Sequence, residues 1–240
     1  MKSSNLILHI ETATDVCSVA ISEGDRKLSQ VESGHERSHA RLLNPYIREA
    51  LRQAGRDFSS LEAVAVSKGP GSYTGLRIGV STAKGIAYAL DIPLLSCGTL
   101  ENMAHGAVNH PSLTGPLNET GGQLLLCPML DARRMEVYSC FYTGTLEVHR
   151  EVAADILTAA SYGDLLKKHH IYFFGNGSVK SSQVLTHPHA HFIEGIDPSA
   201  VNMIPPVWKR FRNNLFEDVA YFEPYYLKDF VATIPRKKVL

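Results

Sequence analysis

The residues of this chain best suited to chemistry lie where an acid ends a strand and where glycines open a helix. An apolar run from Leu6 ends at Glu11, and Thr12 follows it. A later apolar run leads into the turn at residues 68–75, where free backbone amides and the positive end of a helix dipole would attract an anion. The candidates for a vestigial nucleotide or phosphate site are Glu11, Thr12, Gly69, Gly71, Ser72 and Thr74. A tight turn with a polar helix cap is the alternative, because no Gly-Lys-Ser/Thr follows these glycines as in a P-loop.

The second acid, Asp131, stands in a loop that suits a nucleotide poorly. It ends another apolar run, but Ala132, Arg133, Arg134 and Met135 follow it in place of glycines. Loops that wrap phosphates are rich in glycine because their backbone amides must approach closely. One half of a two-sided nucleotide clamp is therefore degraded, which favours a pseudo-enzyme with no catalytic residues of its own.

Metal and nucleophile chemistry lack their usual sets of residues. His35 and His39 lie one helical turn apart, but zinc needs a third protein ligand that nothing nearby in the sequence supplies. His187, His189 and His191 stand in a stretch that we expect to be an exposed loop. No serine or cysteine has a nucleophile-elbow pattern, so peptidase activity is not expected. The sequence predicts no metal site.

Hydrophobic periodicity predicts two similar α/β halves around these residues. In the first half we expect strands at 6–11, 16–22, 27–32, 61–67 and 94–97, and helices from the capping box at Ser33 and Glu36 to Gly55, from 73 to 92, and from 99 to 108. The second half repeats this order, with strands at 124–130, 137–142, 146–152 and 171–175 and a helix at 160–169. Each half is predicted to be a mixed sheet with flanking helices.

The boundary between the halves is placed in the polar, turn-rich stretch 109–122. The N-terminal half then spans residues 1–108 and the smaller C-terminal half spans 109–215. We expect residues 216–240 to pack back on the first half.

Composition limits the classes of function. The 24 basic and 24 acidic residues cancel, so the chain lacks the charge of a stand-alone nucleic-acid binder. No apolar run reaches bilayer length, so we expect neither a signal peptide nor a membrane anchor, and a cytoplasmic location. The four cysteines lie in apolar runs and are expected to be buried thiols.

The helix from Tyr73 predicts a binding surface. Gly75, Gly79, Ala83 and Ala87 recur every four residues, and a glycine inside a helix costs about 1 kcal/mol relative to alanine. Close approach of another backbone would offset that cost. The alternative is packing against the chain's own sheet. The predicted interface residues are His35, His39, Leu42, Leu43, Tyr46, Ile47, Gly75, Ile78, Gly79, Thr82, Ala83 and Ala87.

Several segments resemble the bacterial TsaB (YeaZ) family of the actin-like ATPase superfamily. They are ILHIETATDVCSVAI, HERSHARLLNPYI, VSKGPGSYTGLRIGVSTAKGIAYAL, LDARRMEVY and EPYYLKD, in the same order and at similar spacing. They cover most of residues 6–142 and a short piece near the C-terminus, whereas 150–215 have no matching motif. The resemblance implies two actin-like, ribonuclease H-like half-domains.

The resemblance also implies a role and partners. Members of this family are similar to a larger catalytic paralogue, TsaD, and pair with it and with a small ATPase, TsaE. The complex installs threonylcarbamoyl on the adenosine beside the anticodon of tRNA. This implies a non-catalytic scaffold subunit that meets tRNA indirectly and forms a homodimer when alone. No cofactor is implied as required, although weak adenine-nucleotide binding is an expectation.

Two other functions stay open. A small actin-like ATPase or kinase acting on a small molecule is favoured by Glu11 and the 69–74 loop, and opposed by Arg133 and Arg134. A direct tRNA-binding module would use the basic tail at residues 236–238, which is more typical of a solvated terminus.

Overall fold

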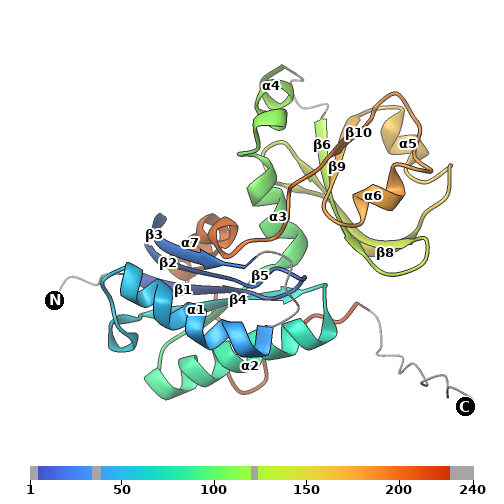
Figure 1. The fold of residues 1–240 in the computed structure, drawn as a ribbon. Helices are drawn as coiled ribbons and strands as arrows, with labels where there is room; N and C mark the ends of the chain where they lie inside the picture. Colours follow the sequence, from blue (N-terminus) through green and yellow to red (C-terminus); the bar gives the residue numbers. More distant parts are fainter. Residues whose placement is uncertain (1–4, 34–38, 120–123, 228–240) are drawn as a thin grey trace, which may run out of the picture.

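Two five-stranded mixed sheets form the centres of two lobes in the computed structural model of the protein (Figure 1). The structure describes residues 5–33, 39–119 and 124–227. The predicted capping box at Ser33 and Glu36 and the predicted interface residue His35 therefore fall partly or wholly outside the described residues.

The first sheet has the strand order β3-β2-β1-β4-β5. Its strands are β1 (Leu6–Glu11), β2 (Ser18–Glu23), β3 (Arg26–Glu32), β4 (Ala63–Gly69) and β5 (Leu94–Gly98). β1 pairs antiparallel with β2 and parallel with β4. Because both faces of β1 are covered, all six of its residues are buried, as a continuous apolar run predicts.

The second sheet repeats this topology, with the order β10-β9-β6-β7-β8. Its strands are β6 (Leu124–Asp131), β7 (Glu136–Thr143), β8 (Val148–Ile156), β9 (His170–Phe174) and β10 (Ala190–Ile193). β6 takes the place of β1, since it pairs antiparallel with β7 and parallel with β9. The repeated order confirms the predicted fold class of two similar half-domains.

Helices cover both faces of the first sheet. Here α1 (His39–Gln53) and α2 (Tyr73–Leu90) lie together on one face, whereas α7 (Ile204–Arg212) lies on the other, next to the 3-10 turn η2 (Ala200–Met203) (Figure 1). The predicted first helix is confirmed and continues through Pro45. A second 3-10 turn, η1 (Phe58–Ser60), precedes β4.

The helix α3 (Thr99–Ala107) joins the lobes (Figure 1). Leu100, Met103, Ala104 and Ala107 lie in the same apolar cluster as Leu124 of β6. The helix that directly follows the first sheet therefore packs on the second.

The second lobe has three more short helices. They are α4 (Pro111–Glu119), α5 (Gly163–Leu166) and α6 (Ser178–Ser181). The prediction that 109–122 is only a turn-rich connection was wrong, because α4 begins there with Pro111, a residue suited to the first helical position. The helix predicted at 160–169 is reduced to one turn, α5. The loop predicted around the three histidines was also partly wrong, since His191 lies in β10, paired with Tyr172.

Packing places the last described segments on the first lobe. Met203 and Val207 lie in one apolar cluster with Ile7 and Leu95, so residues 200–212 pack on the first sheet, although the sequence assigned them to the second half. Val219 and Phe222 pack against the other apolar cluster of this lobe. Contacts formed by residues distant in sequence decided this placement.

Candidate functional site

A cleft of about 1250 Å³ lies between the lobes. From the first lobe, Gly71, Ser72 and Thr74 line it. From the second lobe, Asp131 and Arg133 line it. The glycine turn and the second acid loop therefore face each other across the cleft.

Glu11 is not in the cleft, which corrects its prediction as a phosphate-site residue. The side chain is fully buried. Its Oε1 accepts a hydrogen bond from the Ala13 backbone N–H at 2.6 Å, and its Oε2 accepts one from Asn102 Nδ2 at 2.6 Å. Burial raises the pKa of Glu11 to about 7. The Glu11 carboxyl group thus accepts buried hydrogen bonds within the first lobe and does not line the cleft.

Thr12 is also an interior residue, which corrects its predicted place in the phosphate site. It is fully buried, and its hydroxyl donates a hydrogen bond to the Gly75 carbonyl at 2.8 Å. A Cβ atom on Gly79 would lie 2.2 Å from Thr12 Oγ1. The first turns of α2 therefore lie directly against the end of β1.

The glycine turn is built for close backbone packing. A Cβ on Gly71 would lie 2.3 Å from the Ala13 carbonyl oxygen, and a Cβ on Gly69, whose φ is +113°, would lie 2.7 Å from the Tyr225 carbonyl oxygen. Ser72 accepts a hydrogen bond from the Gly75 N–H at 3.2 Å, and its own N–H donates to Ala13 O at 2.7 Å. These contacts match the alternative of a tight turn with a polar cap.

Lys180 binds the loop that follows Asp131, at residues 131–136. Its Nζ donates to Asp131 Oδ1 at 2.7 Å, to the Arg134 carbonyl at 2.8 Å and to the Glu136 carbonyl at 2.5 Å. Asp131 also accepts a hydrogen bond from the Arg133 backbone N–H at 2.7 Å. Both arginines have positive φ values, +68° and +48°. A lysine ammonium group thus lies against the carboxylate, at a position sequence reasoning missed because Lys180 is 49 residues away.

The predicted small-residue interface was wrong for Gly75, Gly79, Ala83 and Ala87. All four are buried, because this row of α2 packs against the chain's own sheet. Leu43 and Ile47 of α1 are likewise core residues, and buried His39 places its Nε2 2.7 Å from the Thr14 carbonyl oxygen.

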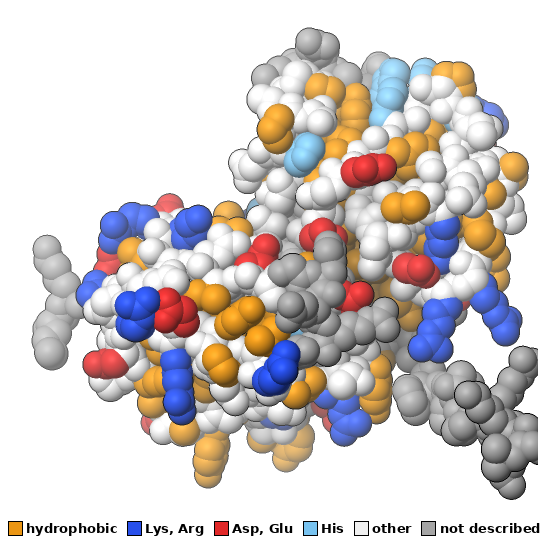
Figure 2. Space-filling model, viewed as in Figure 1, with side chains coloured by type: hydrophobic (Ala, Val, Ile, Leu, Met, Phe, Trp, Pro, Cys, Tyr) orange, Lys and Arg blue, Asp and Glu red, His pale blue; other side chains and the backbone are white. Residues whose placement is uncertain are grey.

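A different row of small residues faces outward. Ser81, Gly85 and Ala89 lie four residues apart on α2 and line a groove of about 470 Å³, and a Cβ on Gly85 would meet no atom within 4 Å. Thr82, Ile86 and Leu90 line the groove from α2, with Asn44 and Phe58. Leu42, Tyr46 and Ile78 are only partly buried. Figure 2 shows hydrophobic side chains between charged ones over the α1–α2 layer. The spacing of this second row was readable in the sequence.

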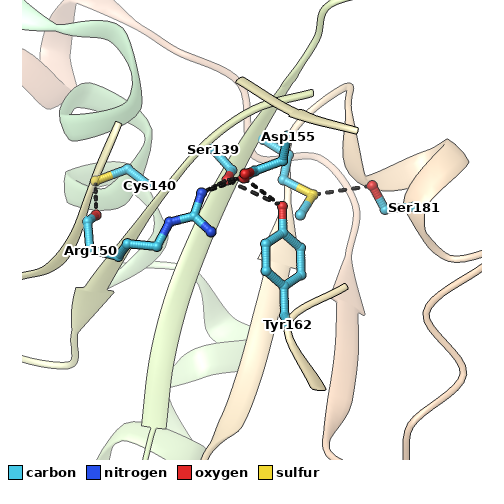
Figure 3. Close-up of polar contacts among 7 residues, drawn as sticks. Ser139, Cys140, Arg150, Asp155, Tyr162 and Ser181 are labelled. Atoms are coloured by element: carbon cyan, nitrogen blue, oxygen red, sulfur yellow. Dashed lines mark hydrogen bonds and ion pairs between the residues drawn. The ribbon is translucent and has the colours of Figure 1, made fainter. Parts of the chain in front are cut away.

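A polar cluster in the second lobe was not predicted (Figure 3). Asp155 accepts hydrogen bonds from Tyr162 at 2.8 Å, from Ser139 at 2.5 Å and from Arg150. The Arg150 guanidinium lies 4.9 Å from the centre of the Phe141 ring. Burial raises the pKa of Tyr162. Because its members bond one another, the cluster joins β7, β8 and the start of α5.

Within the described ranges, no group of three or more His, Cys, Asp or Glu side chains is placed to hold a metal ion. Among the same residues, no helix has the length and apolar character needed to cross a bilayer.

Comparison with known proteins decides the family. A protein of Escherichia coli (strain K12) described as "tRNA threonylcarbamoyladenosine biosynthesis protein TsaB" is 34% identical over 136 residues, which is 57% of this chain and 54% of that protein. A Bacillus subtilis (strain 168) protein with the same description is 29% identical over 182 residues, 75% of this chain and 74% of the relative. The family model described as "TsaD: tRNA N6-adenosine threonylcarbamoyltransferase" matches residues 33–235. The chain belongs to this family, in its TsaB (YeaZ) branch.

The fold agrees with that of a solved TsaB-branch structure. YeaZ from Pseudomonas aeruginosa superposes with a TM-score of 0.74 at 26% identity, covering 93% of this chain and 100% of that one. The match to the E. coli TsaB spans about half of that protein's length. The sequence match to the E. coli protein thus covers 57% of the chain, whereas the fold agrees over 93% of it.

Proposed function

We propose that this chain is a non-catalytic subunit in tRNA threonylcarbamoyladenosine biosynthesis that binds a TsaD-like paralogue. The observation that carries the proposal is the outward groove between α1 and α2. Its apolar side chains are partly covered and its centre, at Gly85, is open to another backbone.

The groove has the features of a helix-binding surface. Small residues allow a partner helix to approach closely, and Ile86 and Leu90 supply apolar area on its flanks. Tyr88 on the same helix is 83% exposed, and tyrosine is enriched among residues that dominate binding energy. Thr82 from the sequence-predicted interface lies in this groove. Leu42, Tyr46 and Ile78 are partly buried against the core of the first lobe, and Ile78 lines the cleft between the lobes.

A paralogue is the partner that fits this surface best. The chain matches the TsaD family model, so a TsaD-like protein has corresponding helices and a related surface to offer. A twofold dimer would bury the same surface of two copies, so the groove also supports a homodimer when the paralogue is absent. A TsaE-like ATPase joins this assembly, the chain meets tRNA indirectly, and the complex is cytoplasmic.

The contacts in the cleft support a non-catalytic role. Lys180 donates a hydrogen bond to the Asp131 carboxylate. At the start of α2, the Ser72 N–H donates to the Ala13 carbonyl and the Ser72 hydroxyl accepts from the Gly75 N–H. Phosphoryl transfer depends on placement and charge at these loops. We propose no required cofactor and weak adenine-nucleotide binding at most. The alternative, a small-molecule ATPase or kinase, would need the Asp131 carboxylate, which already accepts a hydrogen bond from Lys180.

Co-elution with the large paralogue from the same cell tests the proposal. Gly85→Arg should abolish co-elution, because the new side chain fills the groove. Gly115→Arg is the matched control, since Gly115 is an exposed helical glycine of the second lobe with no atom within 4 Å of its Cβ position. Undiminished binding by a folded Gly85→Arg protein would refute the proposed surface.

A further inference from the structure

The chain passes between the lobes at α3 and again just before η2, and the side chain of Asn102 ties both of these segments to the first sheet. Asn102 is fully buried on α3, whose apolar face packs on the second lobe. Its Nδ2 donates to Glu11 Oε2 at the end of β1, at 2.6 Å. Its Oδ1 accepts a hydrogen bond at 3.1 Å from the backbone N–H of Ser199, on the segment by which the chain returns to the first lobe. Separation of the lobes at this point would expose Glu11.

The Glu11 carboxyl is surrounded by hydrogen-bond donors. Besides Asn102, these are the backbone N–H groups of Ala13 and Thr12 and the hydroxyl of Ser67 on β4. Burial raises the pKa of Glu11 and the hydrogen bonds from these donors lower it, with burial the larger effect. Among the described residues, no ion pair includes Glu11. A carboxylate buried without a counterion is unfavourable unless its charge is removed.

The other titratable groups around the site do not supply a positive charge to Glu11. Cys17 before β2 and Cys97 on β5 are thiols whose pKa values burial raises. Glu101 on α3 is paired with Arg210 of α7. Glu32 of β3 accepts hydrogen bonds from the hydroxyl of Ser199 and from the side-chain amide of Gln30. The turn η2 has no titratable side chain, and α2 faces neighbouring Thr12 with glycines.

The protonated carboxyl can satisfy every neighbour in the closed arrangement. Its proton has an acceptor in the Ser67 hydroxyl, which lies 3.0 Å from Thr99 Oγ1 and can donate onward to it. Asn102 still donates to a carboxyl oxygen. The ionised carboxylate instead gains by reaching water, which requires α3 to move away from β1.

We propose that Glu11 and Asn102 form a proton-controlled latch between the lobes, closed while the Glu11 carboxyl is protonated and loosened when it ionises. The closed state holds the pKa of Glu11 at about 7, whereas the open state returns it to the ordinary range of a glutamate. Proton linkage then makes opening about tenfold more frequent at pH 8 than at pH 6.

Hydrogen exchange in the full chain tests the latch. The Ser199 amide should lose about tenfold protection between pH 6 and pH 8, after correction for the intrinsic exchange rate. The carbon-13 shift of the Glu11 carboxyl should titrate near pH 7 over the same range. Global unfolding is followed in parallel, and Ser199 should open with a smaller free energy than the whole protein.

Two variants separate the latch from a general pH effect. Glu11→Gln removes the ionisation, so Ser199 protection should become equal at the two pH values. Glu32→Gln is the matched control, because Glu32 contacts the same serine from an exposed position, and it should keep the native response. Equal protection of the native chain at both pH values would overturn the proposal. So would a Glu11 carboxyl that titrates as an ordinary glutamate, a test that needs no variant to fold.

Discussion

Lys180 lies with its Nζ 2.7 Å from Asp131 Oδ1 and 2.5 Å from the carbonyl of Glu136. Two acids, Glu11 and Asp131, end the first strands of the two sheets, and each has hydrogen-bond partners within the chain. Glu11 is buried under α3, and Asp131 is neutralised by a lysine from α6. Both strand-end acids therefore have structural partners within the two-lobe fold.

Replacing Lys180 with Met should destabilise the protein by about 1–3 kcal/mol, because Asp131 and two carbonyl groups lose their common donor. Urea unfolding measures the change. Lys167→Met is the control. Its ion pair with Asp164 joins two side chains that are 71% and 93% exposed, so the loss there should stay within about 0.5 kcal/mol. Equal effects of the two variants would contradict the role of Lys180.

Alanine substitution at two glycines of α2 should have opposite effects. Gly79→Ala should lower the free energy of unfolding by about 1–3 kcal/mol, because its Cβ would lie 2.2 Å from Thr12 Oγ1. Gly85→Ala should raise it by about 0.5–1 kcal/mol, because helix propensity improves without a clash. Thermal or urea unfolding of both variants checks the orientation of α2. A stabilised Gly79→Ala protein would mean that this row faces away from the sheet.

The pKa of Glu11 predicts that stability falls as pH rises. Because the folded-state pKa is about 7 and lies above the unfolded value, its contribution is complete below the ordinary glutamate range and is lost as pH rises through 7. The loss should amount to roughly 3 kcal/mol by pH 8. Urea unfolding at pH 5 and pH 8 measures it. The Glu11→Gln protein should show a flatter pH profile, and an unchanged profile would exclude Glu11 as the cause.

His9, two residues earlier on β1, predicts the opposite slope. Its Nε2 lies 2.8 Å from Ser22 Oγ, and burial lowers its pKa to about 3. A depressed pKa gives stability that is present above the unfolded value near 6.5 and is lost as pH falls toward 3. Acid unfolding followed by circular dichroism should therefore shift to lower pH in a folded His9→Gln protein. No shift would show that another group controls acid unfolding.

The sequence by itself determined the elements and the repeated order of the two halves. Strands such as Leu6–Glu11 and Leu124–Asp131 are readable because apolar runs and periodicity are local properties of the chain. It also predicted the alternative that the glycine turn is structural, since no P-loop pattern follows Gly71. The side chains after Asp131 predict a loop poorly suited to phosphates, which stays a prediction.

Only the tertiary structure decided which way those elements face. α2 has apolar or small residues on most of its surface, so periodicity could not choose between the row of Gly79 and the row of Gly85 for the sheet. The contact of Thr12 with Gly75, 63 residues away, made that choice. Likewise Asn102, 91 residues from Glu11, covers this strand-end acid and donates a hydrogen bond to it, so that Glu11 is buried. Which side chains are buried depends on residues that are distant along the chain, and a local sequence pattern does not identify those residues.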